Sequence, residues 1–169
     1  MSITMHSASV PVFARMLGNI GGWLDKAEAH AAAKKFDTSV FLASRLAPDM
    51  LPFTRQIQFV CDAAKFGVAR LAGVEAPKFE DNEATLDDLR ERVRKTLAYV
   101  ASVSAASIDG SEEREIVIPM RTRDAIRLSG LVYLQHWALP NFYFHITTAY
   151  ALLRQGGVEL GKADFLAMA

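Results

Sequence analysis

The side chains best placed for chemistry are two pairs of polar residues on otherwise apolar segments. Asn141 and His145 lie four positions apart in "NFYFHITTAYALLR" at residues 141–154, so they share one edge of a predicted helix. Gln58 and Asp62 lie one helical turn apart in "QIQFVCDAA". Both edges flank an apolar stripe, which predicts that the four side chains meet inside a helical bundle. Bundle interiors are where metal and ligand sites are built from facing helices.

His145 has three chemical interpretations. A buried imidazole can satisfy a structural hydrogen bond, serve a ligand pocket or acid–base step, or bind a divalent metal such as zinc or nickel. One histidine beside carboxamides is a poor metal site, because amides are weak neutral ligands and zinc usually takes three strong donors. The sequence therefore favours structural hydrogen bonding, with the ligand pocket and the metal as alternatives.

Two further residues bear on the same question. His136 lies four residues before Pro140 and nine before His145, so a kink at the proline would bring both imidazoles to one end of the bundle. Cys61 sits in the apolar run "IQFVCDAA", which predicts a small core residue and not a nucleophile. The motifs of P-loops, Rossmann folds, serine hydrolases, zinc proteases and EF-hands are absent from the sequence.

Composition excludes several classes of protein. The 19 basic and 19 acidic residues cancel, so the chain offers no electrostatic case for nucleic-acid binding. A length of 169 residues with 51% hydrophobic residues predicts one globular domain over residues 1–169. The single cysteine suits a reducing compartment, and no run approaches the roughly 18 apolar residues of a membrane helix. We expect a cytoplasmic protein without a membrane partner.

Three amphipathic helices are predicted in the first two thirds of the chain, where apolar residues recur three and four positions apart. The first begins after Ser9, with Pro11 in its first turn. The second is opened by Pro52 and ends at Gly73, a natural C-terminal cap. The third is capped by Thr85.

The last third of the chain predicts a short extended segment and then more helix. "EIVIPM" is the one stretch that prefers an extended state, and it can pair near "DAIRLSG" as a hairpin around residues 115–128. "GLVYLQHWA" reads as helical up to Pro140, which ends or kinks it. A fourth long helix then runs from Asn141 to Gly156, and the tail packs outside. The whole predicts an all-α four-helix bundle with long crossover connections.

Two segments resemble a known family. "LPNFYFHITTAYALLRQGGVELGKADFL", with "RLAPDMLPFTRQIQFVCDAAK" upstream, resembles a bacterial family of unknown function within the DinB/YfiT-like superfamily. The resemblance covers essentially the whole chain and implies a four-helix bundle, often dimeric. It also implies a divalent metal held by three histidines in many members, some of which are thiol transferases.

The resemblance also assigns the metal-ligand positions. Members often carry one histidine on the second helix and an HxxxH pair opening the last helix, with an arginine about nine residues beyond. Arg154 lies nine residues after His145, so His145 matches the second histidine of that pair. The first then falls on Asn141 and the second-helix ligand near Gln58, which leaves one histidine of three. The resemblance thus implies a member whose metal site is degenerate.

Three functional hypotheses follow. The first is a small-molecule ligand bound in a polar-edged core pocket by Gln58, Asn141 and His145. The second is a metal-dependent enzyme in which His145 and a carboxylate such as Asp62 hold an altered metal centre. The third is a structural interaction module, with homodimer contacts drawn from the aromatic residues that surround the last helix. Those residues are Trp137, Phe142, Tyr143, Phe144 and Tyr150.

Overall fold

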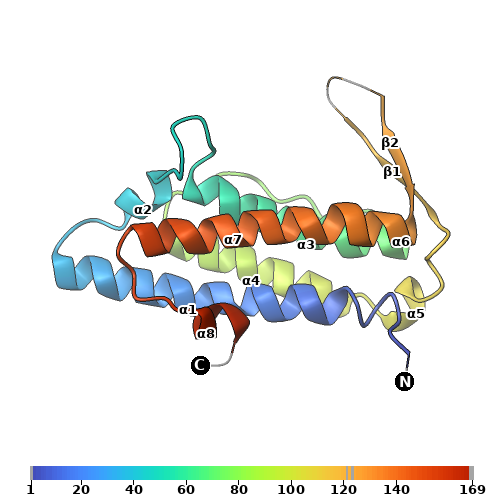
Figure 1. Cartoon of the computed structure of the whole chain (residues 1–169), viewed down its shortest axis with the longest axis horizontal. Helices are drawn as coiled ribbons and strands as arrows, with labels where there is room; N and C mark the ends of the chain where they lie inside the picture. Colours follow the sequence, from blue (N-terminus) through green and yellow to red (C-terminus); the bar gives the residue numbers. More distant parts are fainter. Residues whose placement is uncertain (1, 121, 123, 168–169) are drawn as a thin grey trace.

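The computed structural model describes residues 2–120, 122 and 124–167. It is a bundle of four long helices with a small hairpin projecting beside α6 at one end (Figure 1). The all-α prediction is confirmed. The four long helices are α1 (Val10–Lys34), α3 (Phe53–Ala72), α4 (Leu86–Ser102) and α7 (Leu139–Gln155).

Short elements connect and flank the long helices. They are α2 (Ser39–Ala43), α5 (Ala105–Ile108), β1 (Glu115–Ile118), β2 (Ile126–Ser129), α6 (Gly130–Tyr133), the π-helix η1 (Leu134–Ala138) and α8 (Lys162–Leu166). The strands β1 and β2 pair antiparallel, with Glu115 opposite Ser129 and Ile118 opposite Ile126. The hairpin predicted around residues 115–128 is therefore present.

The predicted helix boundaries have clear local causes. Pro11 lies in the first turn of α1, where its missing N–H leaves no hydrogen bond unmade. Gly73 ends α3 with φ 70°, a left-handed conformation that glycine adopts without strain. Thr85 and Asp88 form a reciprocal capping box at the start of α4. The Thr85 hydroxyl accepts from the Asp88 N–H at 3.1 Å, while the Asp88 carboxylate accepts from the Thr85 N–H at 2.9 Å.

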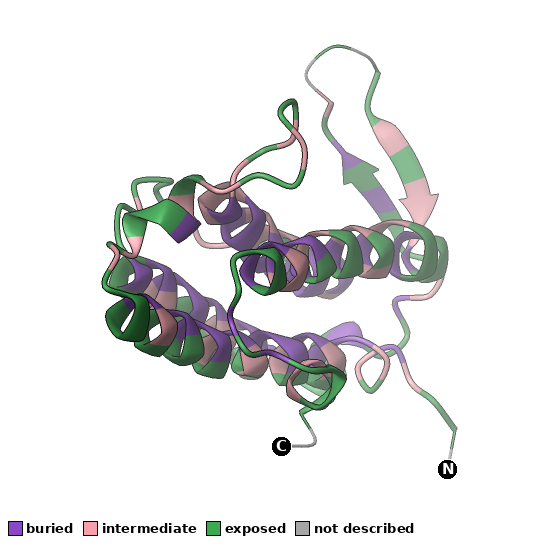
Figure 2. Cartoon of the chain, turned by 60° about the vertical axis from the view of Figure 1, so that its left-hand side comes forward, coloured by how far each residue is buried: buried purple, intermediate pink, exposed green. Residues whose placement is uncertain are grey.

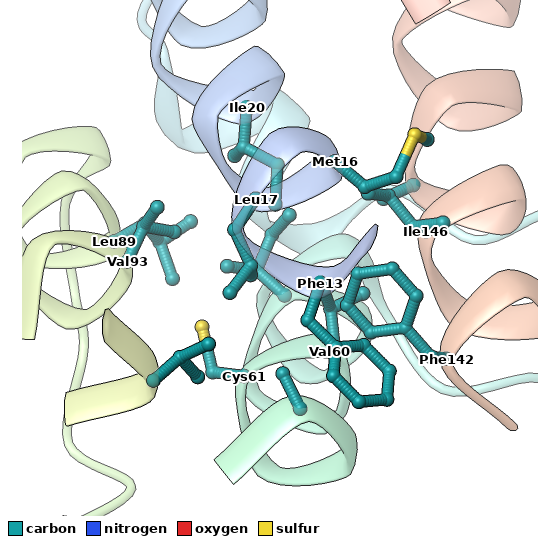
Figure 3. Close-up of a cluster of buried hydrophobic side chains, with 14 of the residues drawn as sticks. Phe13, Met16, Leu17, Ile20, Val60, Cys61, Leu89, Val93, Phe142 and Ile146 are labelled. Atoms are coloured by element: carbon teal, nitrogen blue, oxygen red, sulfur yellow. The ribbon is translucent and has the colours of Figure 1, made fainter. Parts of the chain in front are cut away.

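The apolar stripes of the helices face one another and form one core (Figure 2). At its centre the rings of Phe13 and Phe142 meet edge to face, with centroids 4.9 Å apart (Figure 3). Cys61 is fully buried in the same cluster, and burial raises the pKa of its thiol to about 11. Cys61 is a core residue, as the sequence predicted.

Pro140 neither ends the helix nor separates it from the preceding segment. The elements α6, η1 and α7 form one continuous helix (Figure 1). A proline inside a helix clashes with the carbonyl four residues earlier, here that of His136. The turn before Pro140 is wider than an α-turn, since the Leu139 N–H donates to the Leu134 carbonyl five residues back. The prediction of a helix that begins at Asn141 was wrong because a π-turn accommodates the proline.

The C-terminal segment packs on the outside of the bundle, as predicted. Phe165 of α8 stacks on Trp23 of α1 with ring centroids 5.8 Å apart. Lys26 and Asp164 form an ion pair at 2.6 Å between the same two helices. In the part of the chain that the structure describes, no helix is both long enough and apolar enough to cross a membrane.

Candidate functional site

A cavity of about 230 Å³ opens between α3 and the continuous helix of α6, η1 and α7. The wall from α3 consists of Phe59, Asp62, Ala63, Phe66 and Arg70. The facing wall consists of Tyr133, Trp137, Ala138, Asn141 and His145. Three of the predicted site residues therefore line one cavity: Asp62, Asn141 and His145.

The π-helix shapes one wall of this cavity. Tyr133, Trp137, Asn141 and His145 follow one another at steps of four residues. In an α-helix such a step advances roughly 40° beyond a full turn, so three steps would carry Tyr133 about 120° away from His145. The wider π-turn takes up an additional residue and offsets part of this drift. Pro140 thus helps to place Tyr133 on the cavity face.

His145 is half-buried and held by two contacts from α3. Its ring stacks on Phe59 with centroids 4.9 Å apart, and its Nδ1 lies 2.8 Å from Oε1 of Gln56. The Gln56 amide N–H donates to the Leu51 carbonyl at 2.9 Å, which assigns Oε1 as the acceptor. Nδ1 of His145 therefore carries the proton, and Nε2 is left as an acceptor. Burial lowers the pKa of His145, which favours this neutral form.

Gln56, and not Gln58, is the glutamine of α3 that contacts His145. Gln58 points to the segment before α4, where it donates to Glu83 at 2.6 Å and accepts from Arg55 at 2.6 Å. The expectation that Gln58 joins Asn141 and His145 in a pocket does not hold. Gln56 lies three residues before Phe59, and this spacing on one helix face could have identified it.

His136 also lies outside the cavity. Its side chain is exposed, while Trp137 and Ala138, the next two residues, line the cavity wall. The supposed kink at Pro140, which was to bring His136 towards His145, is replaced by the π-turn. The pairing of these two histidines was therefore wrongly predicted.

Asp62 belongs to the cavity wall and to a group of ion pairs around two buried cations, which we call the ion-pair cluster: Asp62, Lys65, Asp81, Glu83 and Arg92. The Asp62 carboxylate lies 3.0 Å from Nζ of Lys65 and 3.1 Å from the Arg92 guanidinium. The side chains of Lys65 and Arg92 are only 3% and 2% exposed. Two buried cations thus balance Asp62 from the core side.

Arg70 closes the other end of the cavity. Its guanidinium donates to the Tyr133 hydroxyl at 3.2 Å and lies over the Phe66 ring at 5.0 Å. The Tyr133 hydroxyl in turn donates to the Phe66 carbonyl at 3.3 Å, and burial raises the pKa of Tyr133, so the phenol stays neutral. Among the residues that the structure describes, no carboxylate forms an ion pair with Arg70.

Comparison with known proteins identifies the family. The family described as "Domain of unknown function (DUF1993)" matches residues 5–166. The chain belongs to this family. A crystal structure of a DinB family member from Shewanella denitrificans is also similar, at 44% sequence identity with a TM-score of 0.88. That match covers 95% of this chain and 90% of the other, whereas a search of curated proteins found no match. The predicted DinB-like bundle of unestablished activity is confirmed.

The residues of this DUF1993 chain do not fit the three-histidine metal site that the resemblance implies. Within the described residues, no three His, Cys, Asp or Glu side chains are grouped to hold a metal ion. Beside His145, the Gln56 oxygen already accepts the imidazole N–H, and the Asn141 amide donates to the Trp137 carbonyl at 2.7 Å. Asp62 is balanced by Lys65 and Arg92. The donors around His145 are thus carboxamides and a paired carboxylate, which suit zinc or nickel poorly.

The aromatic residues of the last helix have different environments. Phe142 lies in the core, Trp137 lines the cavity, and Tyr150 packs on Trp23 with ring centroids 5.6 Å apart. Tyr143 and Phe144 remain 39% and 58% exposed. Tyr143 and Phe144 each touch one neighbouring ring, of Phe142 and His145, and still keep more than a third of their surface exposed.

Proposed function

We propose that this DUF1993 protein binds a small molecule in the cavity between α3 and α7. The observation that carries the proposal is the convergence of Asp62, Asn141 and His145, which were predicted from sequence, on one cavity. The cavity also offers hydrogen-bonding atoms without protein partners. Among the described residues, neither Nε2 of His145 nor the indole N–H of Trp137 has a partner. Apolar walls with a few convergent polar groups are typical of ligand sites.

The volume of the cavity indicates how much of a ligand it can enclose. A volume of about 230 Å³ equals that of roughly eight water molecules at about 30 Å³ each. This supports a ligand of roughly ten non-hydrogen atoms, smaller than the usual drug-sized molecule. The neutral imidazole of His145 can accept a hydrogen bond or a proton from such a ligand through Nε2.

Nuclear magnetic resonance provides a direct test, because the chain has two tryptophans. Trp137 lines the cavity, whereas Trp23 is buried and its indole N–H donates to the Asp164 carbonyl. We expect ligands from a library of small fragments to shift the Trp137 indole signal and to leave the Trp23 signal unchanged. If no fragment shifts the Trp137 signal, the proposal fails.

Two variants test whether the shift comes from this cavity. Ala63 lines the wall, so Ala63→Leu fills part of the space and should abolish binding. His136→Ala changes an exposed histidine of the same continuous helix and should leave binding intact. Binding that survives Ala63→Leu would place the ligand elsewhere.

An altered metal centre at His145 is the competing proposal. Metal content is measured by mass spectrometry on untagged protein, before and after reconstitution with zinc, nickel, manganese and iron. We expect substoichiometric metal in the unmodified protein and in His145→Ala alike. Near one metal per chain, lost in His145→Ala, would support the metal-dependent enzyme instead.

Compartment and assembly are also proposals. The buried thiol of Cys61 suits a reducing compartment such as the cytoplasm. The exposed rings of Tyr143 and Phe144 suit a homodimer contact, since aromatic residues are enriched at interfaces. Light scattering at high concentration tests the dimer, and a monomer would count against it.

A further inference from the structure

The two charged residues of the cavity wall do not pair with each other. Asp62 and Arg70 are the charged residues that line it, and His145 is neutral because burial lowers its pKa. Asp62 is compensated from behind by Lys65 at 3.0 Å and Arg92 at 3.1 Å. Arg70 has no such partner among the described acidic side chains. The charge that a ligand would meet is therefore the guanidinium of Arg70.

The surroundings of Arg70 favour a flat anion. The guanidinium carries five N–H donors in a planar fork, which matches a carboxylate through two parallel hydrogen bonds. One donation to the Tyr133 hydroxyl, at 3.2 Å, and the contact with the Phe66 ring hold this side chain in place. Further along the cavity, the rings of Phe59, Phe66 and Trp137 supply apolar surface against which an aromatic ring can pack.

We infer that the ligand is a small planar carboxylate, with its anionic end at Arg70 and its ring between α3 and α7. This inference rests on the proposed function, because it names the class of molecule that the same cavity binds. A monoanion fits better than a phosphate dianion, since one unpaired cation faces the cavity and the Asp62 carboxylate lies in the same wall.

His145 and Trp137 add a second level of selection. Nε2 of His145 accepts hydrogen bonds, so a hydroxyl on the ring, remote from the carboxylate, gains a partner at the other end of the cavity. The indole N–H of Trp137 can donate to the ligand between these ends. A hydroxybenzoate combines these features within the size of the cavity.

Matched pairs of acids and amides test the inference. Benzoate and benzamide, and 4-hydroxybenzoate and 4-hydroxybenzamide, have the same shape and differ in the charge of one group. Titrations at pH 7.5 follow the Trp137 indole signal and give a Kd for each compound. We expect each acid to bind about tenfold or more tightly than its amide, because a charge-assisted bidentate contact is stronger than a neutral one.

Two arginine variants assign the effect. Arg70→Gln should reduce the acid-to-amide ratio of affinities to about one. Arg94→Gln makes the same change of charge at a side chain that is 69% exposed on α4, and it should leave the ratio unchanged. An acid preference that survives Arg70→Gln would overturn the role given to Arg70.

The outcomes separate this inference from the proposed function. Equal affinity of acids and amides for the unmodified protein overturns the inference, even if Arg70→Gln fails to fold, and leaves small-molecule binding in place. Absence of binding by all four compounds also overturns the inference. The fragment library then decides the proposed function independently, because it contains neutral and cationic molecules.

Discussion

Two arginines on neighbouring helices show how differently this bundle treats its polar groups. In the ion-pair cluster, Arg92 is 2% exposed and lies within 3.1 Å of carboxylate oxygens of Asp62, Asp81 and Glu83. At the cavity, Arg70 donates to one phenol and has no acidic partner among the described residues. A buried charge is tolerated only when it is paired, whereas a partly exposed one can stay available. The cluster therefore serves the fold, and the cavity can serve a ligand.

The ion-pair cluster fastens the segment before α4 to the bundle. Arg92 donates to the Glu83 carboxylate at 2.8 Å and to the Glu80 carbonyl at 3.2 Å. Nζ of Lys65 lies 4.3 Å from the centre of the Phe79 ring, a cation–π contact. Gln58 joins the same group through Glu83. These contacts hold the polar segment at residues 79–83, which we call the strap, against α3 and α4.

The largest loss in the free energy of unfolding is expected from disrupting this cluster. Arg92→Met removes the buried guanidinium, which breaks the ion pair with Glu83 and leaves Lys65 as the partner of Asp62, at a cost of about 3–5 kcal/mol in the free energy of unfolding. Urea denaturation measures it. Arg94→Met, a similar change at an exposed position of α4, should cost less than about 1 kcal/mol. If the two variants were equally stable, the cluster would not be what holds the strap.

The fold was largely predictable from the sequence because it depends on local signals. The apolar stripe that includes Ile57, Val60 and Ala64 is fully buried, as helical periodicity requires. Thr85 and Gly73 cap the helices at which they were placed. The π-turn was missed because Pro140 alone does not distinguish a helix end from a wider turn. That choice depends on packing between α3 and α7, which no local pattern contains.

An intermediate effect on the free energy of unfolding is expected from the protonation of His145. This residue lines the cavity and forms a hydrogen bond with Gln56 of α3. Burial lowers the pKa of His145 below its ordinary value of 6.5, so the unfolded chain takes up a proton more readily than the folded one. The free energy of unfolding should therefore fall as the pH falls below about 6.5. Between pH 7.5 and pH 5.5, the midpoint of urea denaturation should drop further in the unmodified protein than in His145→Gln.

The control for this prediction is His136→Gln, which changes an exposed histidine and should keep the full pH dependence. Equal pH dependence in His145→Gln and the unmodified protein would mean that His145 is not held in its neutral form. The assignment of Nε2 as a hydrogen-bond acceptor for the ligand would then be unsupported.

The site was less predictable than the fold, because it depends on which side chains of one helix point towards the neighbouring helix. Asp62, Asn141 and His145 were placed on core-adjacent edges and do meet at one cavity. Gln58 and Gln56 differ by two positions, about 200° around the helix. An error in the predicted rotation of the helix therefore selects the wrong glutamine. Gln58 thus belongs to the cluster and Gln56 to His145. Nothing in the sequence marks Arg70 as a site residue except that it shares a helix face with Phe59 and Phe66.

The smallest effect is expected at Arg70, and it completes the comparison between the two arginines. Arg70→Gln removes one hydrogen bond to Tyr133 and a cation–π contact with Phe66, while the Tyr133 hydroxyl keeps its bond to the Phe66 carbonyl. Among the described residues no acidic side chain is left unpaired, so the free energy of unfolding should change by less than about 1 kcal/mol. Urea denaturation beside Arg92→Met measures the contrast directly. A loss at Arg70 as large as at Arg92 would make Arg70 a structural residue, whose charge is not available to a ligand.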